Sequence, residues 1–481
     1  MKRLERKFWL SHNYNLKMIF WFVASDVLAL TISGLLAYFL RVLLEGQVQN
    51  QATYLQLAWV LLIFPFSFAI NGLYPGVGIT PVEEMRRLTL TTGTVWIALT
   101  ALLFLTQSGT LYSRLIFSLF GFFSIITIPL MRFFARRIGL RLGLWGEPVA
   151  LIGFGSYGKK VLQYLNYNRF YGFIPVLIVD GQKDENEIEF EGKIIQKIDA
   201  ETLQKDKSML NRQGIYTVIF VPDETPPTLR KEIGSVDGFG LKHLILITQL
   251  GWVDGSAVIP YDMQGILGLG VQRKLLNPTE RLLKRVLDLL ITLFASIIAL
   301  PVLLVCALLI RLDSPGPIFY SQKRLGYQGK DIQVWKFRTM NKDADKVLED
   351  YLRENPELHS EWRAAHKIKN DPRITRVGKL LRKTSLDELP QMWNVLVGDM
   401  SWVGPRPIVQ DEVSHYQESY LMYVQVRPGI TGLWQSSGRS STNYKYRVNL
   451  DEYYISHWSI WLDIYILLRT IPSVIKREGA W

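Results

Sequence analysis

The chain has 481 residues and carries 55 Lys and Arg against 43 Asp and Glu, which gives a formal charge of +12. Its single cysteine, Cys306, excludes a disulfide scaffold and cysteine-ligated zinc or iron–sulfur sites, and its 48% apolar and 12% aromatic residues exclude intrinsic disorder. The basic excess leaves two kinds of anionic partner, nucleic acid and the anionic face of a membrane.

Four long apolar runs lie within residues 1–146, and each is close to the ~20 residues needed to cross a ~30 Å hydrocarbon core. The runs are Met18–Leu40, Leu55–Tyr74, Leu88–Thr106 and Ser113–Met131. We therefore expect an α-helical membrane domain of four spans in 1–146. A signal peptide for the first run and a buried soluble bundle for all four are the alternatives, but a signal peptide has a shorter apolar region of ~7–15 residues.

Basic residues gather on one side of these runs. Lys2, Arg3, Arg6, Lys7 and Lys17 precede the first run, Arg86 and Arg87 lie between the second and third, and Arg132, Arg136, Arg137 and Arg141 follow the fourth. By the positive-inside rule, the N-terminus and the chain after Arg132 are expected in the cytoplasm. This asymmetry also weighs against a soluble bundle.

A fifth apolar run, 282–310, differs because charged residues load its first turns and Pro301 lies inside it. Proline removes one helical hydrogen bond and collides with the preceding turn, so a kink or break is expected near Leu300. The run either crosses the membrane or dips in and returns as a re-entrant helix, which would keep the following residues in the cytoplasm. Periodicity alone leaves both open.

Residues 147–255 alternate short β-branched runs with helical ones, which is typical of a Rossmann-like α/β domain. Strands are expected at Val149–Ile152, Val176–Val179, Thr217–Val221 and Leu244–Ile247. Gly153, Gly155 and Gly158 follow the first strand in a G-x-G-x-x-G pattern, and Asp180 closes the second. These residues are candidates for binding a nucleotide cofactor, with the glycines at the pyrophosphate and the acid at the ribose. The alternative is a domain that keeps the fold for packing or subunit contact.

A linker at 256–280 precedes a third region, 281–481, where basic motifs are dense. The motifs are Lys336-Phe-Arg338-Thr-Met340, Arg382, Thr384-Ser-Leu-Asp387-Glu388-Leu-Pro-Gln391, Gly404-Pro-Arg406-Pro407 and Arg439 in a glycine-rich segment. Cations around the adjacent acids Asp387 and Glu388 favour a phosphate-rich substrate, and an ionised carboxylate can act as a nucleophile or hold Mg²⁺. A plainer alternative is a capping box, in which Ser385 caps a helix and Glu388 reaches back.

These motifs resemble those of bacterial sugar transferases, the monotopic phosphoglycosyl transferases that make polyprenyl-diphosphate sugars. With four spans and a Rossmann-like insert, the whole chain is similar to the large undecaprenyl-phosphate galactose phosphotransferases. The resemblance implies a mixed α/β catalytic core in 281–481 with a re-entrant helix at 282–310, although Leu300-Pro301 lacks the serine of the family's Ser-Pro break. It also implies a multi-pass protein of the bacterial inner membrane whose soluble domains face the cytoplasm.

The implied reaction transfers hexose 1-phosphate, with galactose as the expected sugar, from a UDP-sugar to undecaprenyl phosphate and releases UMP. The resemblance makes Asp387 the nucleophile that forms a phosphosugar-aspartate, and Glu388 a ligand of Mg²⁺. It assigns substrate binding to Lys336, Arg338, Arg382, Arg406 and Arg439. The product would initiate the synthesis of O-antigen, capsule or exopolysaccharide.

Several alternatives stay open. UDP-glucose is the other candidate donor, because no residue decides the sugar, and an inactive membrane scaffold or nucleotide sensor is the rival of another class. We expect a lipid bilayer and a homodimer as partners and no nucleic acid, because the basic residues flank apolar runs instead of alternating with exposed aromatic ones. Trp458, Trp461 and Tyr465 recur at helical spacing, which predicts an amphipathic helix on the membrane or a buried core helix.

Overall fold

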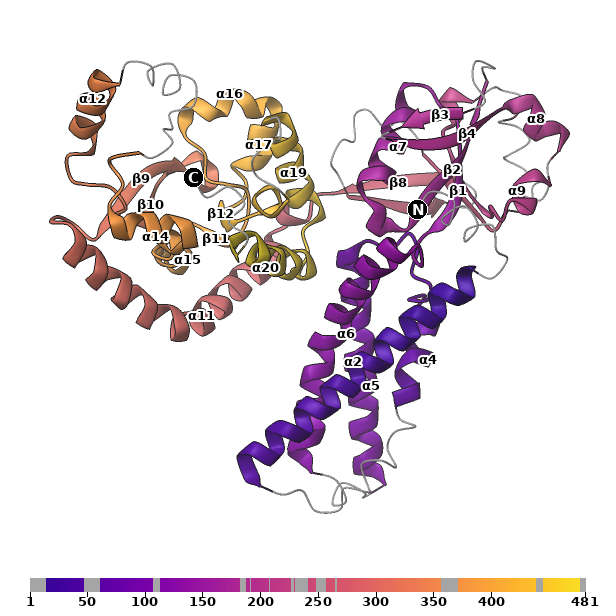
Figure 1. The fold of residues 1–481 in the computed structure, drawn as a ribbon, viewed down its shortest axis with the longest axis horizontal. Coiled ribbons are helices and arrows are strands. Elements are labelled where there is room, and N and C mark those ends of the chain that lie inside the picture. Colours follow the sequence, from indigo (N-terminus) through magenta and orange to yellow (C-terminus); the bar gives the residue numbers. More distant parts are fainter. Residues whose placement is uncertain are drawn as a thin grey trace. The chain divides into compact units, whose positions relative to one another are not determined.

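The computed structural model describes residues 14–46, 61–106, 113–181, 187–190, 192–206, 208–225, 229, 241–247, 257–263, 266–355, 371–437 and 444–475. The chain divides into two compact units, Met1–Leu250 and Gly251–Trp481. Figure 1 shows long helices and a twisted sheet in the first unit, and a mixture of helices and short strands in the second.

Long apolar helices form the N-terminal part of the first unit (Figure 1). Their bounds are α2 Tyr14–Glu45, α4 Ile63–Ile70, α5 Pro81–Leu105 and α6 Arg114–Leu142. Thr80 caps α5 and Ser113 caps α6, each with a side-chain oxygen that accepts from a first-turn N–H. α2, α5 and α6 are long and apolar enough to cross a membrane. The second expected span begins at Leu55, outside the described residues, and its described part contains the short α4.

Charged side chains are buried between these helices. Asp26, the one charge of the first apolar run, accepts from Arg132 of α6, whose Nε and Nη2 each lie 2.7 Å from a carboxylate oxygen. The Tyr74 hydroxyl donates to the same carboxylate, and Arg136 pairs with Glu84 at 3.0 Å. A buried charge that loses its partner is strongly destabilising, so these pairs fix which helix faces meet.

A six-stranded sheet completes the first unit. Its strands are β1 Glu147–Ile152, β2 Phe173–Asp180, β3 Glu187–Phe190, β4 Lys193–Asp199, β5 Thr217–Phe220 and β6 His243–Leu246, in the order β3-β4-β2-β1-β5-β6. The helices beside them are α7 Ser156–Tyr167, η3 Arg169–Tyr171, α8 Ala200–Lys205, α9 Met209–Arg212 and η4 Pro222–Glu224. All neighbouring strands are parallel except β3 and β4. The four expected strands are confirmed as β1, β2, β5 and β6.

The parallel strands of this sheet follow the order of a doubly wound α/β fold, which reverses direction between β1 and β5. Ala150 and Ile152 of β1 belong to one buried apolar cluster, whereas Val149 and Leu151 belong to another. Because successive side chains of a strand point to opposite faces, both faces of the sheet are covered. This explains why the sequence of these strands is a continuous apolar run.

The second unit is a mixed α/β region. Its paired strands are β7 Ala257–Met263 with β8 Ile266–Gln272, β9 Phe319–Leu325 with β10 Asp331–Phe337, and β11 Ser401–Val403 with β12 Gly429–Thr431. Its helices are η6 Lys274–Leu276, α11 Pro278–Asp313, η7 Tyr327–Gly329, α12 Ala344–Glu354, α14 Arg376–Thr384, η8 Leu386–Glu388, α15 Gln391–Val397, η9 Gln410–Glu412, α16 Val413–Tyr416, η10 Gln417–Ser419, α17 Tyr420–Tyr423, α18 Leu433–Ser436, α19 Tyr444–His457 and α20 Ile460–Ile475. The antiparallel β7–β8 hairpin lies in the stretch 256–280 that the sequence predicts to be a linker.

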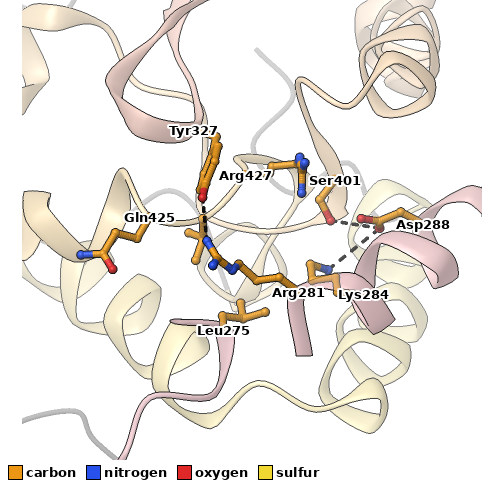
Figure 2. A pocket seen from close by; sticks show the side chains of 9 residues that line it. Leu275, Arg281, Lys284, Asp288, Tyr327, Ser401, Gln425 and Arg427 are labelled. Carbon is orange, nitrogen blue, oxygen red and sulfur yellow. Dashed lines mark hydrogen bonds and ion pairs between the residues drawn. The ribbon is translucent and has the colours of Figure 1, made fainter. Parts of the chain in front are cut away.

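The fifth apolar run forms one helix, α11, which continues through Pro301. Figure 1 shows that this helix is bent, as expected for a proline kink. The charged residues of its first turns are engaged by the rest of the unit (Figure 2): Asp288 accepts from the Ser401 hydroxyl at 3.0 Å and lies 4.0 Å from Lys284. Lys284 also donates to Asp463 of α20 at 2.7 Å.

The C-terminal half of α11 packs on the same unit. Cys306 and Ile310 form a buried cluster with Phe337 of β10 and Leu381 of α14. Most of the remaining apolar side chains of α11 are exposed, and the helix is long and apolar enough to cross a membrane. Both halves of α11 therefore contact one compact core, while the opposite face of the helix presents an apolar surface.

The aromatic segment near the C-terminus lies on α20 and just before it. Trp458 is only 1% exposed, and its indole Nε1 donates to Asp463 at 3.1 Å. Ile466 is buried, whereas Leu468 and Ile471 are more than half exposed. One face of α20 is thus packed in the core, as the buried-helix alternative predicts. Its other face is apolar and exposed.

Candidate active site

The two adjacent acids lie on a short turn between two helices. α14 ends at Thr384, and Ser385 takes the left-handed conformation with φ of 55°, which reverses the chain. Asp387 and Glu388 follow in the single turn η8, and Ser385 makes no side-chain capping bond there. The capping-box alternative is therefore wrong. Left-handed backbone at a residue other than glycine costs about 1 kcal/mol or more, so this turn is held by its surroundings.

Strand β10 brings Lys336 to this turn. Ile332 and Val334 are buried, and Lys336 lies on the same face because side chains alternate along a strand. Its Nζ donates to Glu388 Oε1 at 2.7 Å, although 52 residues separate the two. Asn394 of α15 fixes the strand beside the turn, because its side chain donates to the Gln333 carbonyl at 2.7 Å and accepts from the Trp335 amide at 3.0 Å.

The Asp387 carboxyl is half-buried, and its pKa is raised from 3.8 to about 6. Burial is the largest cause, and the neighbouring Glu388 charge adds to it, whereas Lys336 and Arg382 oppose it. The group is consequently ionised at neutral pH but poorly solvated. A carboxylate in this state is a better nucleophile than a fully hydrated one, provided that cations keep it charged.

Arg382 reaches the same place from α14. Its Nε donates to the Thr339 hydroxyl at 2.9 Å, and its charge acts on Asp387 and Asp371. α14 can approach Thr339 closely because Gly378 has no side chain: a Cβ there would lie 2.2 Å from the Thr339 carbonyl oxygen. Arg373 binds Asp371 through two nitrogens. Arg382 therefore stays beside the acid pair.

Arg338 is used differently from its motif neighbours. Its Nη2 donates to the Ser314 carbonyl at 2.7 Å and the Ser314 hydroxyl at 2.8 Å, and its Nη1 donates to the Pro315 carbonyl at 2.9 Å. The side chain is buried, and it holds the turn that follows α11. Its predicted contact with a substrate phosphate stays a prediction.

An open cavity with an empty volume of about 520 Å³ lies beside the acid pair. It is lined by Gln322, Arg324, Val334, Lys336, Glu388, Gln391, Arg406, Pro407, Gly429, Ile430 and Gln435. Three of the predicted residues, Lys336, Glu388 and Arg406, thus meet at one surface. Arg324 was not among the predicted site residues, and only its place in a basic motif two residues before a glycine could have indicated it.

Two arginines line the cavity, and the surroundings of Arg324 do not fully balance its positive charge. Burial lowers the pKa of Arg324, and the charge of Arg406 lowers it further, while Glu412 at 3.9 Å opposes the shift. Arg406 also lies over the Trp434 ring, with its guanidinium carbon 5.7 Å from the ring centroid. Cations held close together at one open surface form a receptor for a multiply charged anion such as a diphosphate.

The remaining predicted residues fall elsewhere. Arg439 lies outside the described residues. Gly153, Gly155 and Gly158 lie on the turn from β1 to α7, and Asp180 ends β2 and pairs with Lys197 at 3.1 Å. The strand, turn and helix of the glycine motif are where the sequence predicts them.

The acid pair has the donor chemistry for a divalent cation. Among the described residues no three His, Cys, Asp or Glu side chains gather as a closed metal site. Mg²⁺, however, keeps several waters and is usually held by one or two carboxylates together with substrate phosphates. Glu388, next to Asp387 at the edge of a cationic cavity, fits that pattern, although Lys336 already neutralises part of the Glu388 charge.

Comparison with known proteins matches two parts of the chain to families. Residues 279–477 match the bacterial sugar transferase family, and residues 69–202 match a family described as a CoA-binding domain. The second match extends from the end of the second apolar run into the sheet domain.

Longer matches to individual proteins cover about three quarters of the chain. The chain is 34% identical over 77% of its length to the undecaprenyl-phosphate galactose phosphotransferase of Salmonella typhimurium, of which it covers 77%. It is 34% identical over 77% of its length to the UDP-galactose-lipid carrier transferase of Erwinia amylovora, of which it covers 76%. It is also 40% identical, over 74% of both chains, to the UDP-glucose:undecaprenyl-phosphate glucose-1-phosphate transferase of Klebsiella pneumoniae. The chain belongs to the bacterial sugar transferase family.

Proposed function

We propose that this chain transfers a hexose 1-phosphate from a UDP-sugar to undecaprenyl phosphate and releases UMP. The observation that carries the proposal is the half-buried Asp387 with a raised pKa beside a cavity lined by Lys336, Arg324 and Arg406. The relatives named above act on UDP-sugars or undecaprenyl phosphate, as their names state. The lipid-linked product would begin the assembly of a surface polysaccharide.

The transfer proceeds in two displacements at one phosphorus. An Asp387 carboxylate oxygen attacks the phosphorus that carries the sugar, and the bond from that phosphorus to the bridging oxygen breaks, which releases UMP. An oxygen of undecaprenyl phosphate then attacks the same phosphorus, the acyl-phosphate bond breaks, and the Asp387 carboxylate is restored. Lys336, Arg324 and Arg406 bind the phosphates and reduce their repulsion of the attacking carboxylate.

Glu388 is the residue that would hold Mg²⁺, beside the Asp387 nucleophile. When bound, the cation offsets negative charge on the diphosphate. In the described structure, Glu388 has a second role that needs no metal, because it orients Lys336 and raises the pKa of Asp387.

Galactose is the proposed sugar, and glucose is the second candidate. Two relatives named for galactose and one named for glucose each match about three quarters of the chain. Of these three, the glucose 1-phosphate transferase has the highest identity to the chain. The cavity contains polar side chains that can bind sugar hydroxyls, namely Gln322, Gln391 and Gln435, but their types suit either epimer.

We also propose that α11 enters the bilayer and returns without crossing it. Its first turns are bound through Asp288 and Lys284, and its last turns pack through Cys306 and Ile310, in both cases on the same core. A straight crossing would carry the two ends to opposite sides of a ~30 Å hydrocarbon layer, where one core could not hold both. Re-entry leaves the acid pair at the membrane surface, level with a lipid phosphate.

This topology fits the other parts of the proposal. α2, α5 and α6 cross the bacterial inner membrane with the second apolar run, the Rossmann-like domain and the catalytic core lie in the cytoplasm, and two chains form a homodimer. UDP-sugars and the proposed active site are then on the same side of the membrane.

The test uses the full chain purified in detergent with undecaprenyl phosphate, Mg²⁺ and a panel of UDP-sugars. We expect UMP release with one preferred hexose, and loss of transfer in Asp387→Asn. Asp411→Asn is the matched control, because Asp411 is an exposed acid of the same core and should retain full activity. Release of UDP in place of UMP, or unchanged turnover in Asp387→Asn, would contradict the proposal.

A further inference from the structure

The glycine-rich turn of the first unit lies at the point where a doubly wound sheet normally binds its ligand. Gly153, Gly155 and Gly158 follow β1, and η4 follows β5, the parallel neighbour of β1. The strand order reverses between these two strands, and the crevice at their carboxyl ends is the usual nucleotide site of such folds.

A carboxylate of the chain itself occupies this turn. Glu224, the last residue of η4, accepts from the backbone N–H of Gly155 at 2.8 Å, of Tyr157 at 2.6 Å and of Gly158 at 2.7 Å. The Ser156 hydroxyl lies 3.4 Å from the same group. These are the N–H groups that a G-x-G-x-x-G turn offers to a pyrophosphate.

The fit between the carboxylate and the turn is tight. A Cβ at Gly155 would lie 2.6 Å from the Glu224 carboxyl carbon, and one at Gly158 would lie 3.1 Å from a carboxylate oxygen. The close approach that glycine normally permits to a phosphate is therefore made by Glu224. The expected ribose ligand is also engaged, since Asp180 pairs with Lys197 at 3.1 Å and accepts from the Gly181 amide at 2.7 Å.

The Glu224 carboxylate is charged at neutral pH. Burial raises its pKa, but the three backbone N–H bonds outweigh burial, and the pKa is lowered overall. A diphosphate and this carboxylate are both anions that need the same donors, so they cannot be bound together.

We propose that Glu224 is an autoinhibitory anion that closes the glycine-rich turn, so that a diphosphate-bearing nucleotide binds there only when the Glu224 carboxylate leaves. The apparent affinity for such a ligand is reduced by the fraction of chains in which the turn is open. The contact is local to the sheet domain and does not depend on the proposed sugar-phosphate transfer.

The test compares the full-length protein with three variants. Glu224→Ala removes the anion, and Glu224→Asp keeps its charge but withdraws it by one methylene. Asp223→Asn is the matched control, because Asp223 is the exposed acid that precedes Glu224 on η4. The probes are ADP and inorganic pyrophosphate, and calorimetry measures their affinities. Hydrogen exchange of the peptide 153–162 then shows whether they bind at this turn or at the phosphate-binding cavity of the catalytic core.

The wild type and Asp223→Asn should show no ligand protection of peptide 153–162 at millimolar probe. Glu224→Ala should bind ADP or pyrophosphate at least ~10-fold more tightly, with protection of that peptide, and Glu224→Asp should be intermediate. Equal affinity in the wild type and Glu224→Ala would overturn the proposal, and so would the absence of binding in both Glu224 variants. If Glu224→Ala fails to fold, the comparison of Glu224→Asp with the wild type decides in the same way.

Discussion

Protonation of Asp387 is expected to stop the first half of the proposed transfer near pH 6. The attacking group must be the carboxylate, and burial together with the Glu388 charge raises the Asp387 pKa to about 6. Because the protonated form is the inactive one, the rate falls as pH decreases through that value. Removing the like charge in Glu388→Gln should move the acid limb to lower pH, and removing the cation in Lys336→Met should move it to higher pH.

The size of the effect follows from the ionised fraction. A group with a pKa of about 6 is about 90% ionised at pH 7 and about 10% at pH 5, so the rate should fall about tenfold. With the ordinary value of 3.8, the same carboxyl would be more than about 90% ionised at both pH values, and the rate would hardly change. A factor of about ten therefore separates a buried nucleophile from a solvated one.

The assay must exclude the lipid, because a phosphate monoester has its own second ionisation near pH 6. Single-turnover release of UMP from a UDP-sugar, without undecaprenyl phosphate, isolates the step in which Asp387 attacks. Asp411→Asn is the control variant, since an exposed acid of the same core should leave the limb in place. Near-UV circular dichroism at pH 5 verifies that the protein stays folded.

A flat profile between pH 5 and pH 7 would refute the reasoning, because it would mean that the group whose ionisation limits the step is not a buried carboxyl. Shifts of the limb in the same direction for Glu388→Gln and Lys336→Met would refute it as well. The two variants change the local charge in opposite senses, so only opposite shifts agree with a nucleophile placed between them.

Three further predictions concern the cavity, the core and the topology. Arg324→Ala should raise the KM for the UDP-sugar about tenfold, whereas Lys323→Ala, on the exposed side of the same strand, should leave it unchanged in steady-state assays. Arg338→Met should reduce the free energy of unfolding by about 2–4 kcal/mol in thermal denaturation, and a change in KM without loss of stability would contradict its role in the turn after α11. In intact cells, an impermeant thiol reagent should label a cysteine at Glu45 but not one at Lys342, and labelling at Lys342 would count against re-entry of α11.

Much of the fold could be predicted because its signals are local. Apolar length indicates the long helices, and runs of β-branched residues between turns indicate four of the six strands of the sheet. β3 and β4 were not predicted: β3 is a polar edge strand with no apolar signal, and charged and polar residues interrupt the isoleucines of β4. The β7–β8 hairpin was missed as well, although residues 257–272 pair along their full length.

The candidate site could be predicted less completely, because it depends on contacts between distant residues. Lys336 and Glu388 belong to separate motifs, and their contact is visible only in the structure. The local pattern also favours a capping box at Ser385, which the structure does not form. No local signal connects Glu224 with a glycine motif more than 60 residues earlier. A glycine motif whose N–H groups are already bonded has the same local sequence as one whose N–H groups are open to a ligand. Only the positions of the neighbouring groups distinguish the two.

The arginines of the catalytic core also fall into two groups, those whose donors are bonded within the chain and those that face the cavity. Arg338 and Arg373 give most of their donors to the chain itself, through the turn after α11 and through Asp371. Arg324 and Arg406 face the cavity, where the Glu412 carboxylate, 3.9 Å from Arg324, offsets only part of the positive charge. A phosphate binds where cations are incompletely neutralised, because a donor that is already bonded must lose one partner to gain another. The number of motif arginines therefore overstates the size of the phosphate site, and the charge imbalance at the cavity locates it.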